Sequence, residues 1–254
     1  MEFFVYMLVL NACMVPYLVQ GDGNIDSAPG LTFHPEPPKQ DTYENNLIWY
    51  KAHDEKNVKF WTNRLDNFLE VYKNSSLLPG AGKNKMTCDD HNPPSAGKVC
   101  DVNIDRWSPC THEYGYAYHH RSPCIFLKLN NVLGWRPEIY NGSLPESMPR
   151  DLKHHISSYR NYKDKQLNTL WVSCQGESPV DEENIGPIMY IPRRGFPGYF
   201  FPFTDTEGYL SPLVAIHFER PMSGIIINVK CKLWAPNISH DQGQGTLNFE
   251  LLVD

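Results

Sequence analysis

Cysteines are the residues of this sequence with the clearest chemistry, and their placement predicts disulfides rather than catalysis. Seven are present, and Cys13 stands apart in an apolar N-terminal run. The other six form an even set: Cys88, Cys100, Cys110, Cys124, Cys174 and Cys231. Such a set is typical of three bridges formed in an oxidising compartment. The spacing alone leaves the pairing of the six open.

Histidines close to two of these cysteines raise the alternative of a zinc site. The donors that gather there are Cys110, His112, His119, His120 and Cys124. Zinc accepts both residue types. In an oxidising compartment, however, two cysteines this close in sequence more often form a disulfide, which leaves the histidines in a solvated loop. The sequence therefore favours a bridge over a metal ion.

Other motifs that could carry catalysis are incomplete. His112-Glu113 begins like the helix of a zinc protease, but Tyr116 stands where the second histidine is required. Gly80-Ala81-Gly82-Lys83 resembles the end of a phosphate loop, but Asn84 follows where Ser or Thr would bind magnesium. We therefore expect no enzyme activity, no cofactor, no metal and no small-molecule substrate.

Three sequons agree with the compartment that the cysteines indicate. They begin at Asn74, Asn141 and Asn237, and none has proline in its middle position. Together with the six cysteines they predict entry into the secretory pathway and glycosylation at all three positions. The formal net charge of -6 provides no electrostatic footprint for nucleic acid.

Aromatic residues are concentrated in one short segment that also contains proline. Tyr199, Phe200, Phe201 and Phe203 surround Pro202 there. Aromatic side chains at this density either fill a core or form an interaction surface, where they supply large contact area at low entropic cost. Rings alternate in direction along an extended stretch, so at least one of them should lie outside the core.

The elements that must hold these residues are mainly β. Residues 21–45 are rich in proline, glycine and acids and predict an extended stalk. Apolar residues at three- and four-residue steps from Val58 to Tyr72 predict one amphipathic helix that ends near Pro79. Short β-rich runs then follow at 124–130, 169–173, 213–219, 224–234 and 246–253. They predict an antiparallel β-sandwich within one domain, residues 46–254.

The N-terminal run from Phe3 to Val19 is uncharged but contains Asn11 and Pro16. It is at the short limit for a membrane-spanning helix and longer than the apolar part of a usual signal peptide. No basic residue precedes it, so the charge rule for orientation does not apply. A signal-anchor and a cleaved signal peptide both remain open for residues 1–20.

The chain resembles the β subunit family of the sodium/potassium-transporting ATPases, in its insect form, from about Ala28 to Asp254. The resemblance is densest in SPCIFLKLNNVLGWRPE, LWVSCQGESP, NIGPIMYIPRRGFPGYFFPF, EGYLSPLVAIHF and GIIINVKCKLWAPNI. Together these segments are far more specific than any short motif. Residues 1–20 match neither the cytoplasmic tail nor the full-length anchor of the family, which favours a truncated or alternative start.

The resemblance implies a fold, a partner and a set of site residues. It implies the bridges Cys88–Cys100, Cys110–Cys124 and Cys174–Cys231. It also implies an immunoglobulin-like sandwich outside the cell, on a single-pass type II protein of the plasma membrane that would be secreted if the N-terminus were cleaved. The residues implied to face the catalytic α subunit are Tyr199, Phe200, Phe201, Pro202, Phe203 and Tyr209.

The implied role is non-catalytic support of the α subunit: its folding, membrane delivery and cation affinity during sodium export and potassium import. Family members usually carry tyrosine where Phe200, Phe201, Phe203 and Thr204 stand, so the contacts that the phenol hydroxyls could make in those members are not expected at these positions. The alternative function is that of a stand-alone extracellular adhesion or junction module.

Overall fold

The computed structural model describes residues 28–38, 46–130, 132–161 and 165–254. The predicted apolar segment, residues 1–20, lies outside these ranges. No helix within them is both long enough and apolar enough to cross a bilayer.

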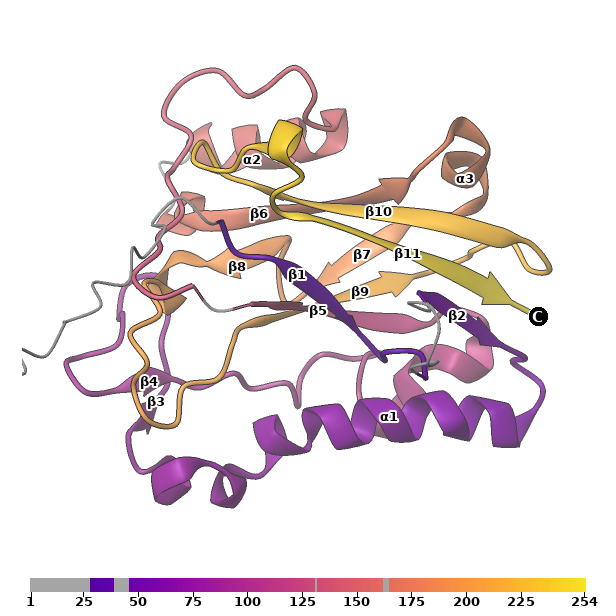
Figure 1. Ribbon diagram of the computed structural model, residues 1–254, viewed down its shortest axis with the longest axis horizontal. Helices are drawn as coiled ribbons and strands as arrows, with labels where there is room; N and C mark the ends of the chain where they lie inside the picture. The colour runs from indigo at the N-terminus through magenta and orange to yellow at the C-terminus, as the bar shows by residue number, and fades with distance from the viewer. Residues whose placement is uncertain (1–27, 39–45, 131, 162–164) are drawn as a thin grey trace, which may run out of the picture.

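The fold is mainly β and is built on two sheets that lie one over the other (Figure 1). The four-stranded sheet is antiparallel and has the order β1 (Leu31–His34), β5 (Cys124–Leu129), β9 (Leu213–Phe218), β7 (Ile188–Ile191). The five-stranded sheet has the order β2 (Leu47–Tyr50), β11 (Thr246–Val253), β10 (Ile226–Trp234), β6 (Thr169–Gly176), β8 (Gly195–Pro197), and in it only β2 and β11 are parallel. A short parallel pair, β3 (Lys85–Met86) and β4 (Val99–Cys100), lies beside them.

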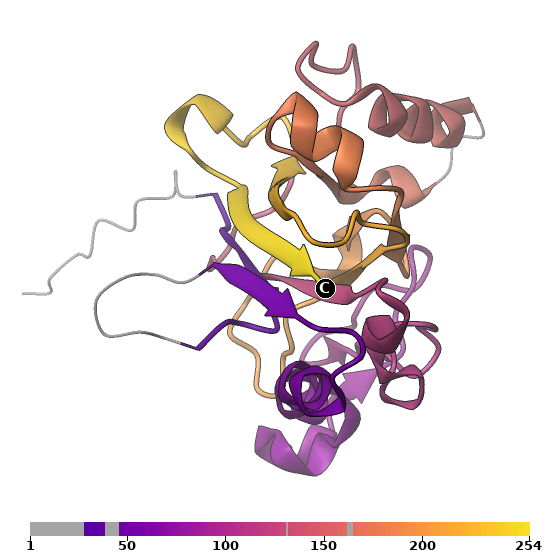
Figure 2. The ribbon, with the colours of Figure 1, turned by 90° about the vertical axis from the view of Figure 1, so that its right-hand side faces the viewer.

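Two helices cover the outer faces of this pair of sheets. The long helix α1 (Glu55–Lys73) runs along the four-stranded sheet, and α2 (Arg150–Asn161) lies over the five-stranded sheet (Figure 1). Figure 2 shows the same stack with α1 seen along its axis. A third helix, α3 (Pro179–Asn184), is a single short turn beside β6 and β10.

Local sequence explains why α1 forms where it does. The Asp54 side chain accepts hydrogen bonds from two backbone N–H groups of the first turn, which caps the helix. Its buried face consists of Val58, Trp61, Leu65, Leu69 and Tyr72, as the periodicity predicts. The helix ends at Lys73, earlier than predicted, because Asn74 is extended and its side chain caps a following 3-10 turn.

The main core lies between the sheets and continues under α1. Phe33 of β1 stacks on Phe249 of β11 with ring centroids 4.9 Å apart, so the sheets are in direct contact. Both β5 and β9 are buried on nearly all positions, because one face meets the other sheet and the opposite face is covered. A second, smaller cluster joins Leu152 and Ile156 of α2 to Trp171 and Trp234 of the five-stranded sheet.

The five predicted strands are present as β5, β6, β9, β10 and β11, with ends shifted by up to three residues. The prediction of a single helix is wrong, because α2 and α3 were missed. Helix α2 offers only a narrow apolar stripe, and α3 is six residues long and is held by a capping box between Ser178 and Asp181. A six-residue helix such as α3 is too short for periodicity to distinguish it from a loop.

The prediction of a stalk over residues 21–45 is wrong at its centre. Leu31–His34 forms β1, an edge strand paired with β5, so the β body begins before residue 46. Prolines flank this strand in the sequence, and only Leu31 and Phe33 alternate as buried positions. Four residues are too few for that alternation to stand out. Residues 21–27 and 39–45 lie outside the described ranges.

Candidate functional site

The predicted aromatic segment lies at one end of the two sheets, after β8. It begins with a 3-10 turn, η5 (Gly198–Phe200), and continues in the connection to β9. Backbone contacts hold both of its ends: Gly198 N–H donates to the carbonyl of Asn168 at 2.7 Å, and Gly134 N–H donates to the carbonyl of Phe203 at 2.9 Å. The segment is therefore fixed by the body of the protein.

The rings of this segment differ in burial. Phe200 is 7% exposed and belongs to the main core. Tyr199, Phe201, Phe203 and Tyr209 are partly buried. This split agrees with the expected alternation of ring direction, and it makes Phe200 a core residue rather than a surface one.

Contacts with other aromatic rings hold the partly exposed rings of the segment in place. Phe201 meets Trp135 edge to face with centroids 5.7 Å apart, and Phe203 lies 4.9 Å from Tyr209. Such pairs stabilise an arrangement beyond the area that they bury. Burial raises the pKa of Tyr209, which agrees with the position of its ring among these contacts.

A hollow of about 450 Å³ opens beside the segment. One wall is the segment itself, with Tyr199, Phe201, Pro202, Thr204 and Tyr209. The opposite wall is the loop closed by the first disulfide, residues 90 and 93–100, with single contributions from Arg136 and Asn168.

An ion pair links Asp90 of the loop wall to Arg193, which lies against Tyr199 of the aromatic wall. The guanidinium of Arg193 donates to both carboxylate oxygens of Asp90, at 2.8 and 3.2 Å. Both side chains are only 16% exposed. The same guanidinium lies 5.6 Å from the ring centroid of Tyr199. Bidentate geometry of this kind fixes orientation as well as distance.

The structure also tests the prediction about the cysteines. Bridges join Cys88 to Cys100, Cys110 to Cys124 and Cys174 to Cys231, the pairings that the resemblance implies. Cys174 and Cys231 face each other on the neighbouring strands β6 and β10, so this bridge lies within one sheet. In the described part of the chain, no group of three or more His, Cys, Asp or Glu side chains could hold a metal ion.

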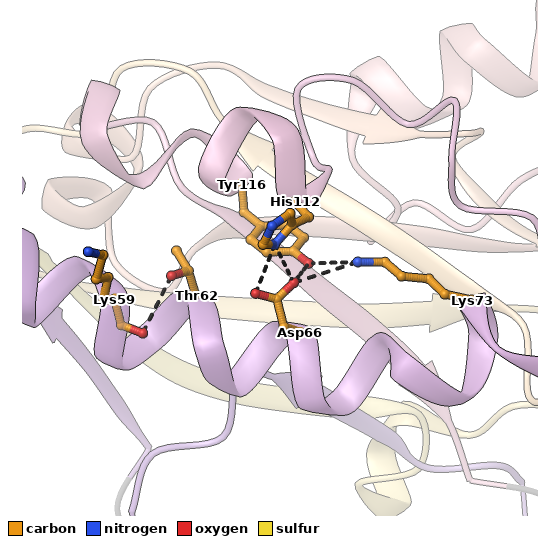
Figure 3. A network of polar contacts seen from close by, with 6 residues as sticks. All are labelled: Lys59, Thr62, Asp66, Lys73, His112 and Tyr116. Atoms are coloured by element: carbon orange, nitrogen blue, oxygen red, sulfur yellow. Dashed lines mark hydrogen bonds and ion pairs between the residues drawn. The ribbon is translucent and has the colours of Figure 1, made fainter. Parts of the chain in front are cut away.

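His112 takes part in a polar network between α1 and the 3-10 segment η3 (His112–His120), shown in Figure 3. The carboxylate of Asp66 accepts from the Tyr116 hydroxyl at 2.6 Å and lies 2.8 Å from His112 Nδ1. The Lys73 ammonium is 3.6 Å away. Burial, and then the bond to Asp66, raises the pKa of Tyr116, so the phenol remains a donor. The network ties the loop closed by Cys110–Cys124 to α1.

The three sequon asparagines are all exposed. Asn74 accepts from the backbone N–H and hydroxyl of Ser76, at 3.1 and 2.6 Å. Asn237 accepts from Glu138 N–H and donates to the Arg136 carbonyl, at 3.0 and 2.8 Å. N-glycosylation leaves one hydrogen on the amide nitrogen, so this donor bond is compatible with a glycan.

Sequence reasoning identified the aromatic wall and missed the rest of the hollow. Asp90, Lys98 and Arg136 carry the charges of its lining, and Arg193 pairs with Asp90; these residues come from separate parts of the chain. No local motif links them, since tertiary contact alone brings them together. The geometry defines a hollow that aromatic rings and charged side chains surround.

Comparison with known proteins specifies the family. A family model described as the sodium/potassium ATPase beta chain matches residues 2–249. The chain is 55% identical to sodium/potassium-transporting ATPase subunit beta-2 of Drosophila melanogaster, over 91% of this chain and 72% of that protein. It is 35% identical to subunit beta-1 of the same species, over 92% and 73%, and 24% identical to human subunit beta-2, over 90% and 73%. The chain belongs to the sodium/potassium ATPase beta chain family, whose members are non-catalytic subunits of the pump.

Proposed function

We propose that this chain binds the catalytic α subunit of a sodium/potassium-transporting ATPase and supports its folding, membrane delivery and cation affinity. The observation that carries the proposal is the family match over residues 2–249, together with 55% identity to a beta-2 subunit. ATP hydrolysis and ion transport belong to the α subunit, and this chain acts by contact alone.

The contact runs through the aromatic segment. Phe201 and Phe203 are its main anchors, supported by Tyr199, Pro202 and Tyr209, because these side chains are partly exposed and held in place by ring contacts. Phe200 supports the segment from the core.

The proposal includes an orientation at the membrane, which rests on the family. We assign residues 1–20 to a signal-anchor of a type II plasma-membrane protein with its β body outside the cell. Pro29 lines the same small cavity as Phe201, Phe203 and Tyr209. The connection from residue 20 to Pro29 can span at most about 30 Å, which keeps the aromatic segment close to the membrane surface.

The β body is assigned to the immunoglobulin-like class of sandwiches. Two mostly antiparallel sheets in contact support this assignment. Its longest-range bridge differs from that of antibody domains, because it joins neighbouring strands rather than opposite sheets. Asn74, Asn141 and Asn237 carry N-glycans in this proposal, since all three are exposed sequon asparagines.

Co-expression in cells depleted of their own β subunits tests the proposed function. The full chain and an α subunit are produced together, and the α subunit is measured at the cell surface and after detergent capture of the β chain. We expect both amounts to rise well above those obtained with an unrelated single-pass glycoprotein. Equal α delivery with and without the chain, and no α subunit in the captured material, would contradict the proposal.

A further inference from the structure

The hollow beside the aromatic segment carries unneutralised positive charge. Lys98 and Arg136 both line it, and neither forms an ion pair with a carboxylate of the described residues. The Lys98 ammonium lies 3.3 Å from a backbone carbonyl, that of Lys83, which leaves its charge uncompensated. The one acid in the lining, Asp90, is already paired with Arg193. In a chain of net charge -6 this local excess of cations is a distinct feature.

The hollow is also built to keep its width. The Cys88–Cys100 bridge closes the loop that forms one wall, and the largely buried Asp90–Arg193 pair fixes that loop to the aromatic wall. A site whose walls are fixed before binding loses less conformational entropy when a ligand enters. Hydroxyl groups of Ser95, Thr204 and Thr206 add hydrogen-bonding capacity next to the rings.

We propose that this hollow receives an extended, acid-bearing segment from the extracellular surface of the α subunit. Lys98 and Arg136 bind its carboxylate, and Tyr199, Phe201 and Tyr209 pack against its apolar atoms. Arg193 is a positioning residue that holds the two walls in register. This inference rests on the proposed function and extends it, because it adds the disulfide loop as a second contact surface and specifies the charge of the partner.

Aromatic rings beside two cations favour a peptide over a lipid headgroup as the occupant. A headgroup would satisfy the cations but would leave the ring-lined part of the hollow unfilled. A peptide segment offers both a carboxylate and apolar side chains at neighbouring positions. Complementary charge of this kind contributes to the specificity of association and to its rate.

Charge reversal of the pair tests the inference in the full chain co-expressed with an α subunit. The test variant is Lys98→Glu with Arg136→Glu, and the matched control is Lys56→Glu with Arg106→Glu, which changes the same net charge at exposed positions outside the hollow. We expect the apparent affinity for the α subunit to fall by about tenfold or more in the test variant and to stay within about twofold in the control. The Lys98→Gln and Arg136→Gln pair should give a smaller loss, and it replaces the test variant if charge reversal lowers β abundance.

Four outcomes separate the possibilities. Normal α binding by the reversed pair, or an equal loss in the control, would overturn the inference. Binding of the purified chain to phosphatidylserine vesicles that depends on Lys98 and Arg136, with α binding unchanged, would overturn it in favour of a lipid surface. If the unsubstituted chain recovers no α subunit, the proposed function itself fails. If the unsubstituted chain recovers the α subunit and only the charge-reversed pair loses it, the result supports both the proposed function and this inference.

Discussion

Two regions of this protein are rich in aromatic residues, and they differ in what covers them. Under α1, Trp107, Tyr116 and Phe126 pack with ring centroids 6.1 to 6.3 Å apart and are at most 6% exposed. At the end of the sheets, Phe201 and Phe203 make equally close ring contacts but remain partly exposed. The same residue types therefore stabilise the fold in one region and are available for binding in the other.

The covering layer explains the difference. Helix α1 closes the first region and is tied to it by the Asp66 network. In the described part of the chain, the second region is bordered by a hollow with charged walls. Composition alone cannot separate these cases, because burial depends on which distant segment lies above the rings.

Replacing a buried aromatic ring under α1 should cause the largest decrease in the free energy of unfolding. Phe126→Ala leaves a cavity in a site that is closed on both sides, and we expect it to lower the free energy of unfolding by about 3 to 5 kcal/mol. Phe203→Ala should lower it by less than half as much, because its ring is partly exposed. Urea unfolding of the purified β body measures both. Equal losses would remove the distinction between the two regions.

Loss of the Cys174–Cys231 bridge should cause the next largest decrease in stability. The bridge joins residues 57 apart in sequence, and the chain-entropy model assigns it about 4 kcal/mol, against about 3 for the Cys88–Cys100 bridge with its separation of 12. Paired Cys→Ser variants, compared by unfolding and by the amount exported, should rank in that order. The reverse order would indicate that the first loop matters more to folding than its length implies.

Acid should loosen the region covered by α1. Burial, and then the charge of Lys128, lowers the pKa of His34 to about 4, although the half-exposed Glu36 carboxylate lies 3.9 Å from the ring. His34 stacks on Phe68 of α1 with centroids 3.6 Å apart. In the unfolded chain this group binds a proton below about pH 6.5. The unfolded state therefore holds more protons between about pH 6.5 and 4, and stability falls as the pH falls through that window.

The loss from His34 should approach about 3 kcal/mol near pH 4. His34→Phe keeps the stacked ring and removes the titrating group, so its unfolding free energy should depend less on pH over the same window. Parallel urea titrations at pH 7.5, 5.5 and 4.5 measure this. Identical pH dependence of the two proteins would contradict the assignment.

The smallest effect on the fold is expected at the sequons. Asn141 is exposed and makes no hydrogen bond that the structure records, so Asn141→Gln should remove one glycan and change stability by less than about 0.5 kcal/mol. Asn74→Gln and Asn237→Gln should each remove one glycan as well, with a somewhat larger cost because their side chains bond to neighbours. Gel mobility before and after glycosidase treatment checks all three. Unchanged mobility of the parent chain would contradict entry into the secretory pathway.

Much of the fold could be predicted because the local pattern of apolar residues in the sequence indicates the elements. The apolar face of α1 has a periodicity that burial explains, and the five strand runs are short segments rich in apolar residues between turns. Strand β1 could not be predicted, since its pairing with β5 is decided by residues about 100 positions later. The aromatic half of the candidate site was visible as a dense cluster. Its charged half was not, because Asp90 and Arg193 meet only in the folded protein.

The central claim, that the partly exposed rings bind the α subunit, is tested most directly by the α subunit recovered per folded β chain. Phe201→Ala and Phe203→Ala should each weaken association by about 2 kcal/mol or more at normal β abundance. Phe200→Ala should instead lower β abundance, because its ring lies in the core. Normal α recovery by both exposed-ring variants, or misfolding of all three, would contradict the account.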